Sequence, residues 1–348
     1  MKKVNIYYSQ YSAAKFLALR RTDQLAELLG VSLEELFSMV SEPSYRTFHI
    51  PKRSGGLREI NSPEGKLSKI QRLLSRYLNA IYLLDPHPAV FGFVKEPNVA
   101  TPLSTVSPDT LRYFVKKRTI IGNARSHLRK KYVLNIDLSD FFGSCSATRV
   151  RQLFLRAPFH FDMELATCLA LITTYRKKLP AGAPSSPILT NFMANGMDKQ
   201  LSMLSEQFNF IYTRYADDLT FSSDVSIKAE SIQQIRQLID ACGFRINFRK
   251  FRLQKSTAKQ EVTGIKVNQK LNVDRKYVRN LRALLFQIEK NGFLYCAKKH
   301  FTDTQTTDEK LIVRFRNLVI GRIDFLGQVR GREDDIYLRF LYRFESCT

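Results

Sequence analysis

The sequence contains no run of 18 or more apolar residues, and residues 1–21 mix polar side chains into every apolar group. A membrane-spanning helix needs about 20 mostly apolar residues in a row, and a signal peptide needs an apolar core. The sequence therefore predicts neither, and no membrane partner. Cysteine is scarce as well: the five cysteines lie far apart and form no C-x-x-C pair. This spacing argues against a disulfide framework and a zinc knuckle, and it favours free thiols in a reducing cytoplasm.

Acidic residues are also few, with 32 Asp and Glu against 55 Lys and Arg, which gives a net charge of +23. A fold gains nothing from such self-repulsion, so the excess of positive charge indicates a polyanionic partner, most often nucleic acid. The 44% of hydrophobic and 25% of charged residues are typical of a globular chain. The length of 348 residues suggests two or three domains, or one enzyme core with an appendage.

Local patterns predict the order of helices and strands. Ser32 to Glu35 matches a capping box at the start of a helix. A second helix is expected to begin with Ser62 as its cap and Pro63 in its first turn. Past Asp274 the pattern is wholly helical. Strands are expected at residues 47–50 and 57–60, which flank a glycine turn, at residues 132–138, and in a second hairpin at 210–223.

Three carboxylates stand out against this background. Asp217 and Asp218 lie at the tip of the second predicted hairpin, where two adjacent charges repel each other unless they are solvated or meet a cation. Asp137 lies in the apolar strand, where a carboxylate is unfavourable unless it is paired or bound to metal. If the two elements are neighbours in one sheet, three hard oxygen donors converge. Such a set suits two Mg²⁺ ions about 3.5–4 Å apart, the arrangement used in nucleotidyl transfer.

Three segments in order resemble the A, B and C motifs of reverse transcriptases. They are residues 135–142 (NIDLSDFF), residues 179–187 (LPAGAPSSP) and residues 215–218 (YADD). Two more resemble regions that mark bacterial retron reverse transcriptases: residues 123–127 (NARSH) resemble the N-A-x-x-H region and residues 262–264 (VTG) the V-T-G region.

The resemblance runs from about residue 48 to residue 273 and implies an α+β fold of the right-hand polymerase type, with fingers, a palm built on an antiparallel sheet and a helical thumb. The domains expected from it are an N-terminal helical appendage (1–44), fingers (45–131) with an inserted loop at about 95–118, a palm (132–273) with a fingers segment at about 146–190 interleaved, and a thumb (274–348).

The resemblance also implies roles for single residues. Asp137, Asp217 and Asp218 would be the catalytic carboxylates and hold the two Mg²⁺ ions, with Mn²⁺ able to substitute. Asp140 is expected to cap the helix that follows it rather than to bind metal. Residues implied to bind the incoming dNTP are Arg58 and Lys52 on the basic hairpin, Phe142 as a bulky gate against a ribose 2′-hydroxyl, Gly182 with Ala181 where the family usually has Gln, and Lys250 as a proton donor to pyrophosphate.

Contacts to nucleic acid are expected from a further set of residues. Most of them have an alternative. The stripe of Arg275, Arg279 and Arg282 would equally suit a solvated helix face, and a structural role suits His127. A generic phosphate-binding patch would explain Arg249, Arg252 and Lys250 equally well. Phe142 and Arg58 have alternatives of the same kind, as a core aromatic and as part of a merely basic hairpin. The expected nucleic-acid-binding residues are Asn123, His127, Arg249, Arg252, Arg275, Arg279 and Arg282.

The function that the resemblance implies is that of a retron reverse transcriptase. Such an enzyme copies part of its own structured noncoding RNA into DNA from an RNA 2′-hydroxyl, and the branched RNA–DNA hybrid serves anti-phage defence with an effector protein. The expected partners are thus this RNA and its DNA copy, dNTPs and an effector. Two alternatives stay open: another reverse transcriptase class (diversity-generating, group II intron-like or abortive-infection type), and a non-catalytic RNA-binding palm scaffold.

Overall fold

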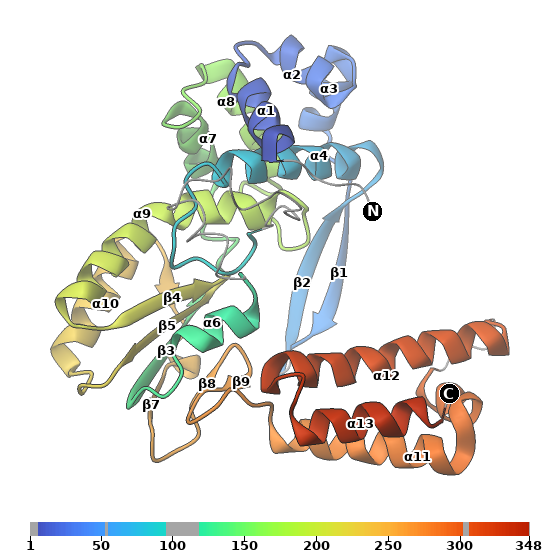
Figure 1. Ribbon diagram of the computed structural model, residues 1–348. Helices are drawn as coiled ribbons and strands as arrows, with labels where there is room; N and C mark the ends of the chain where they lie inside the picture. Colours follow the sequence, from blue (N-terminus) through green and yellow to red (C-terminus); the bar gives the residue numbers. More distant parts are fainter. Residues whose placement is uncertain (1–5, 53–54, 95–117, 302–305, 348) are drawn as a thin grey trace. The chain divides into compact units, whose positions relative to one another are not determined.

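The computed structural model describes residues 6–52, 55–94, 118–301 and 306–347 (Figure 1). The inserted loop expected at about 95–118 therefore lies, except for Arg118, outside the described residues. The chain divides into two compact units, which are unit 1 (Met1–Thr119 and Leu134–Leu253) and unit 2 (Ile120–Val133 and Gln254–Thr348).

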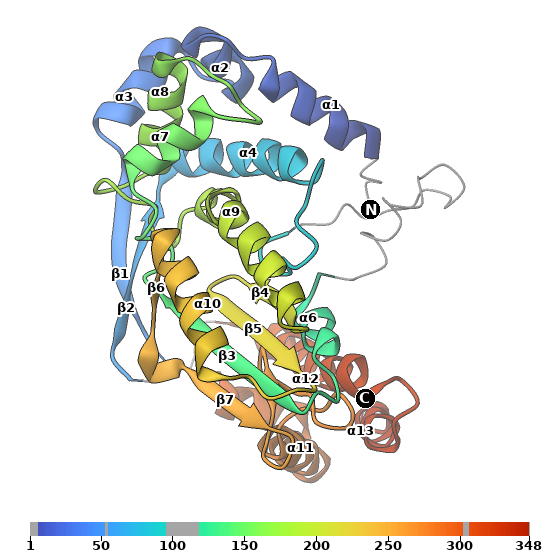
Figure 2. The ribbon, with the colours of Figure 1, turned by 90° about the vertical axis from the view of Figure 1, so that its left-hand side faces the viewer.

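The helices of unit 1 gather in two places. In the first group, five helices pack around or beside the long helix α4. In the second group, α9 and α10 lie against the main sheet (Figure 2). The helices of the first group are α1 (Ile6–Leu17), α2 (Thr22–Leu29), α3 (Leu33–Ser41), α4 (Gly65–Tyr82), α7 (Ala147–Leu155) and α8 (Met163–Thr173). Those of the second are α9 (Ser186–Gln207) and α10 (Ala229–Ala241).

The capping box at the start of α3 is confirmed, because the Ser32 hydroxyl accepts from the backbone N–H of Glu35 and the Glu35 carboxylate accepts from that of Ser32. Two other expected helix starts are wrong. Ser62 lies in a strand, where Pro63 is paired with Tyr45, and the next helix begins only at Gly65. Asp140 lies in a turn, and the helix after it is capped by Ser146. Long-range strand pairing overrides the local start signal in the first case.

A basic hairpin forms as predicted from β1 (Tyr45–Pro51) and β2 (Leu57–Pro63), which pair antiparallel. The main sheet has the strand order β4-β5-β3-β6, with β7 also paired to β3. Its pairs β4–β5 and β3–β6 are antiparallel. The strands of this sheet are β3 (Tyr132–Ser139), β4 (Ile211–Tyr215), β5 (Asp218–Ser223), β6 (Arg245–Ile246) and β7 (Arg252–Lys255).

Unit 2 is built on three helices around one apolar core, as the helical pattern past Asp274 predicted. Leu281, Leu285 and Ile288 lie on the inner face of the long helix that begins at Arg275, and they are buried in a core shared with the two helices that follow it. A short helix and a small hairpin join the same core. The elements are α6 (Ile120–Ser126), β8 (Glu261–Val262), β9 (Ile265–Lys266), α11 (Arg275–His300), α12 (Asp308–Arg330) and α13 (Asp335–Glu345). Among the described residues, no helix combines the length and the apolar character needed to cross a bilayer.

Candidate active site

The turn between β4 and β5 presents two adjacent carboxylates. Tyr215 pairs with Asp218, so that only Ala216 and Asp217 form the loop of the hairpin. Ala216 has a φ of 58°, the left-handed conformation that two-residue hairpin loops require. This tight turn fixes Asp217 and Asp218 at the end of the strand pair.

Asp137 is brought to the same place by the sheet. It lies on β3, which neighbours β5, and the residue as a whole is only 7% exposed. The backbone N–H of the next residue, Leu138, donates to the carbonyl oxygen of Asp217 at 2.9 Å. The three aspartates that the sequence singled out therefore converge on one end of the sheet.

The turn disfavours negative charge, first because it is desolvated and second because the carboxylates lie close together. Desolvation by the surrounding protein, followed by the nearby charges of Asp217 and Asp137, raises the pKa of Asp218 to about 6, although Asp218 itself is exposed at the tip. Desolvation also raises the pKa of Asp217, with Asp137 adding to it. The positive charges of Lys250 and Arg58 act in the opposite direction on the pKa of Asp217. The site thus favours a positively charged ligand.

Two side chains hold the carboxylate of Asp137. Lys250 donates from Nζ to Oδ1 at 2.7 Å, and Asn247 donates from Nδ2 to Oδ2 at 3.1 Å. The backbone N–H of Asn247 also donates to the carbonyl oxygen of Asp137, at 2.8 Å. Both residues come from the connection between β6 and β7, where residues 248–250 form a single 3₁₀ turn. Sequence reasoning found Lys250 but not Asn247, whose only signal was its place directly before that turn.

The predicted nucleotide-binding loop lies against the basic hairpin. The backbone N–H of Asn61 on β2 donates to the carbonyl oxygen of Ala181 at 2.8 Å. Gly182 has a φ of 114°, and a methyl group there would overlap the side chain of Ile60. Glycine is therefore required at this close approach. Arg58, two residues earlier on β2, is exposed, and its charge reaches Asp217.

Lys52 makes no hydrogen bond or ion pair with this group in the described part of the chain. It lies at the exposed end of the hairpin, where its backbone N–H donates to the carbonyl oxygen of Gly56 at 2.9 Å.

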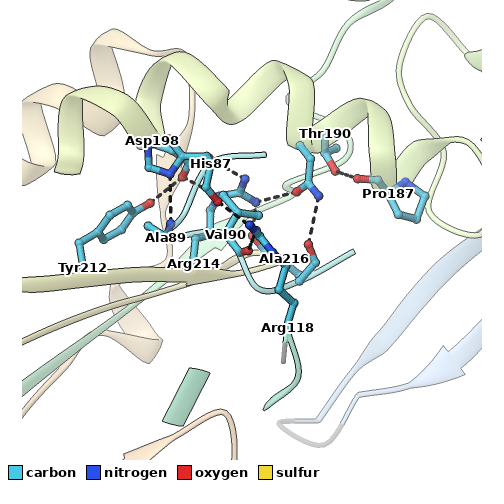
Figure 3. A network of polar contacts seen from close by, with 12 residues as sticks. His87, Ala89, Val90, Arg118, Pro187, Thr190, Asp198, Tyr212, Arg214 and Ala216 are labelled. Carbon is cyan, nitrogen blue, oxygen red and sulfur yellow. Dashed lines mark hydrogen bonds and ion pairs between the residues drawn. The ribbon is translucent and has the colours of Figure 1, made fainter. Parts of the chain in front are cut away.

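A buried network lies under the aspartate turn (Figure 3). Arg214 and Asp198 are fully buried and form a two-point ion pair, with N–O distances of 2.8 and 2.7 Å. The hydroxyl of Tyr212 donates to the same carboxylate at 2.7 Å. Arg214 also donates to the carbonyl oxygen of Ala216 at 3.1 Å and to Asn191 at 3.2 Å. Arg214 thus ties the turn to α9, a role that sequence reasoning did not find.

Comparison with known proteins shows the family to which the chain belongs. The family described as "Reverse transcriptase (RNA-dependent DNA polymerase)" matches residues 50–267. The retron Ec86 reverse transcriptase of Escherichia coli is 33% identical over 267 residues, which are 76% of each chain. The chain belongs to the retron reverse transcriptases. Its fold is therefore the right-hand polymerase of the α+β class, as predicted.

Two relatives from Myxococcus xanthus are longer than this chain. The retron Mx65 enzyme is 31% identical over 293 residues, 77% of this chain and 63% of that protein. The retron Mx162 enzyme is 31% identical over 313 residues, 78% of this chain and 59% of that protein. The chain thus spans less than two thirds of the length of either. Among solved structures, a telomerase from Candida albicans in complex with a fragment of telomeric RNA aligns with 12% identity and a TM-score of 0.45, over 88% of this chain and 60% of that one.

Reverse transcriptases use divalent metal ions, and the carboxylates at the turn fit such an ion in their chemistry. Desolvation first, and then the neighbouring carboxylates, raise the pKa of Asp217 and of Asp218, and a bound cation would stabilise the charged form of both. Both oxygens of Asp137 accept a hydrogen bond, one from Lys250 and one from Asn247, which fixes the orientation of the carboxylate. The described residues hold no three His, Cys, Asp or Glu side chains already arranged around a metal position. That the metal is magnesium, that two ions bind, and which residues bind them stay predictions.

Phe142 is a half-buried residue in the turn that follows β3, at residues 140–144. Its ring contacts Phe141, with centroids 6.0 Å apart, and Phe93, with centroids 5.9 Å apart. Phe141 is buried and also faces Phe244 at 5.5 Å. Phe142 is therefore partly open and partly packed, which its expected role as a gate requires.

The residues expected to bind nucleic acid fall into two groups. Asn123 and His127 are fully buried within the described residues, so the structure does not present their side chains to a ligand on the surface. Burial, reinforced by the charge of Lys130, lowers the pKa of His127 to about 3, and the imidazole is neutral at pH 7. The exposed group consists of Arg249 and Arg252 in unit 1 and Arg275, Arg279 and Arg282 on α11 in unit 2.

Proposed function

We propose that this protein is an RNA-directed DNA polymerase that joins deoxynucleotides by two-metal nucleotidyl transfer. The observation that carries the proposal is the convergence of Asp137 with the Asp217–Asp218 turn, in a chain of the reverse transcriptase family. Three carboxylates with this crowding have a clear use in holding cations. Mg²⁺ ions bound there would activate the primer hydroxyl and stabilise the leaving pyrophosphate.

The other residues of the site support the same chemistry. Arg58 presents its guanidinium from the exposed face of β2, where it suits a two-point contact to a triphosphate. The loop at Ala181 and Gly182 is fixed against that strand and offers a rigid surface to the base and sugar. Lys250 lies beside Asp137 and supplies a proton donor near the leaving group. The ring of Phe142 excludes a ribose 2′-hydroxyl by steric overlap.

The retron relatives support a narrower form of the proposal. The template is a structured noncoding RNA, the primer is a 2′-hydroxyl of that RNA, and the product is a branched RNA–DNA hybrid that serves anti-phage defence with an effector protein. The net charge of +23 suits a stable complex with such an RNA. The five cysteines are free thiols, which fits a cytoplasmic site of action.

A primer-extension assay with purified protein, an RNA template and Mg²⁺ tests the polymerase. Asp217→Asn and Asp218→Asn keep the shape of the turn and remove one charge each, and we expect both to abolish DNA synthesis while RNA binding is retained. Asp240→Asn, on the exposed face of α10, is the matched control and should keep full activity. DNA synthesis by the Asp217→Asn, Asp218→Asn double variant would refute the assignment of the site.

Sequencing of the nucleic acid that co-purifies with the protein tests the narrower form. A single RNA joined to DNA through a 2′ branch is the expected result. Linear complementary DNA without a branch would favour another reverse transcriptase class, and RNA without any DNA would favour a non-catalytic binding protein.

A further inference from the structure

The ring of Phe142 is held on its packed side by a second phenylalanine from a distant segment. Phe93 faces Phe142 with centroids 5.9 Å apart and an angle of 37° between the ring planes. Both rings are half-buried. A single bulky residue blocks a 2′-hydroxyl only if its ring does not swing aside, and rotation about χ1 moves a free phenylalanine between rotamers easily. A contact that restricts this rotation therefore affects the selectivity of the gate.

Residues 89–92, which lead directly into Phe93, are fixed to β4 below the aspartate turn, and Figure 3 shows Ala89 and Val90 beside Arg214. The backbone N–H of Phe91 donates to the carbonyl oxygen of Arg214, and the N–H of Arg214 donates to that of Ala89, both at 2.8 Å. Asn191 on α9 donates to the carbonyl oxygen of Gly92 at 3.1 Å. Arg118 donates to the carbonyl oxygen of Val90 at 2.5 Å. These bonds come from three different parts of unit 1, so the position of the segment is over-determined.

The local backbone shows that this position is maintained against strain. Gly92 packs so closely on the turn that a methyl group on it would overlap the backbone nitrogen of Ala216. Phe93 itself has a φ of 61°, a left-handed conformation that is unfavourable for a residue with a large side chain. Strain of this kind is retained where the surrounding structure enforces it, and often at functional sites. Here it accompanies the contact between the rings of Phe93 and Phe142.

We propose that Phe93 is a specificity-determining positioning residue, which keeps the Phe142 ring in the orientation that rejects ribonucleotides. The inference rests on the proposed role of Phe142 as the gate. Phe93 acts through Phe142 and not on the nucleotide, so its removal changes the choice of sugar and leaves the binding of the triphosphate almost unchanged.

The test is the ratio of kcat/KM for a dNTP to kcat/KM for the matching rNTP. This ratio does not depend on the fraction of folded enzyme, because both values come from one preparation. We expect Phe93→Ala to lower the ratio about tenfold, the size of effect that small changes in a steric pocket produce. KM for the dNTP should change less than about threefold. Phe93→Leu, which keeps apolar bulk and disturbs folding less, should restore most of the selectivity.

Phe142→Ala and the double variant Phe93→Ala, Phe142→Ala complete the cycle. We expect Phe142→Ala to lower the ratio strongly and the double variant to match it, because Phe93 has no ring left to hold. Two results would show that the inference about Phe93 is wrong while Phe142 is still the gate. In the first, Phe142→Ala lowers the ratio but Phe93→Ala does not. In the second, the double variant lowers the ratio by the product of the two single effects. If Phe142→Ala leaves the ratio unchanged, the gate itself is wrong.

Phe208→Ala is the control for the loss of a ring. Phe208 is also half-buried and faces a second ring, that of Phe210, with centroids 5.5 Å apart. This pair lies just before β4, at the opposite end of the strand from the aspartate turn. Phe208→Ala should leave the ratio at the value of the unmodified protein, and a ratio lowered as far as that of Phe93→Ala would overturn the inference.

Discussion

Lys250 donates from Nζ to Oδ1 of Asp137 at 2.7 Å, although the two residues are 113 positions apart in the sequence. Asn247 takes the other carboxylate oxygen at 3.1 Å. Asp137 is thus held at both oxygens by one short connection, that between β6 and β7. A carboxylate fixed in this way keeps its orientation when the neighbouring aspartates or a ligand change their charge.

Asn247→Ala is therefore expected to weaken the binding of divalent cations. Removal of groups that orient metal ligands lowers metal affinity by roughly tenfold or more. The Mg²⁺ concentration for half-maximal DNA synthesis should rise by a similar factor. Titration with Mn²⁺, followed by electron paramagnetic resonance on the protein without nucleotide, gives a readout that does not depend on activity. Gln234→Ala on the exposed face of α10 is the control. Equal Mn²⁺ affinity in Asn247→Ala and the unmodified protein would contradict the prediction.

Much of the site could be predicted from the sequence because its signals are local. Alternation of apolar and polar residues marks a strand, and the Asp217–Asp218 pair between two such runs marks a hairpin tip. The position of Asp137 in an apolar run made it anomalous without any structure. For each of these residues, a few neighbours in the chain were enough.

The parts that the sequence did not reveal depend on distant partners. Asp198 stands next to Lys199 on α9 and reads as a solvated helix residue, yet it is fully buried because Arg214 arrives from β4. Asn247 gains its role only when β6 is placed beside β3. His127 was found through a motif, but nothing in its neighbours indicates that it is buried. Polar pairs between elements leave no periodic pattern, so composition and spacing miss them.

The buried ion pair of Arg214 and Asp198 predicts a large loss of stability when one partner is neutralised. Removal of one charge from such a pair leaves the other buried and uncompensated, which costs about 3–5 kcal/mol. We expect a loss of that size for Asp198→Asn in the free energy of unfolding, measured by urea titration with circular dichroism. Tyr212→Phe, which removes one hydrogen bond to the same carboxylate, should cost about 1 kcal/mol.

Exposed carboxylates give the matched control for this measurement. Asp240→Asn on α10 should change the free energy of unfolding by no more than about 0.5 kcal/mol. The double variant Arg214→Met, Asp198→Leu removes both charges and should lose less stability than Asp198→Asn. An Asp198→Asn protein as stable as the unmodified one would rule out a structural role for the pair.

His127 predicts a loss of stability in acid. Its pKa in the folded protein is about 3, because of burial and the charge of Lys130, whereas an unperturbed histidine has a pKa of about 6.5. In the window between these values only the unfolded chain takes up the proton, so stability falls as the pH falls. The slope from this one group reaches about 1.4 kcal/mol per pH unit. His127→Gln cannot take up the proton and should show a shallower decline.

The measurement is the urea midpoint of both proteins at several pH values from 7 to 4. A difference in urea midpoint that stays the same at every pH would reflect packing alone. The predicted result is a difference in urea midpoint that shrinks or reverses as the pH falls. Parallel curves for His127→Gln and the unmodified protein would show that His127 is not neutral and buried in solution.

The exposed arginines of α11 predict how RNA binding depends on salt. Arg275, Arg279 and Arg282 are spaced to share one face of the helix, and they form no ion pair with the residues that the structure describes. Each phosphate contact releases counterions, so the slope of log K against log salt is about −0.7 to −0.9 per contact. If all three contact phosphates, changing them to Gln reduces the slope by about 2 to 3 and weakens binding to different RNA sequences alike. Filter binding at several salt concentrations measures this slope.

Lys299→Gln, near the other end of α11, is the control and should alter the slope by less than one. An unchanged slope in the triple variant would mean that Arg275, Arg279 and Arg282 form only a solvated helix face.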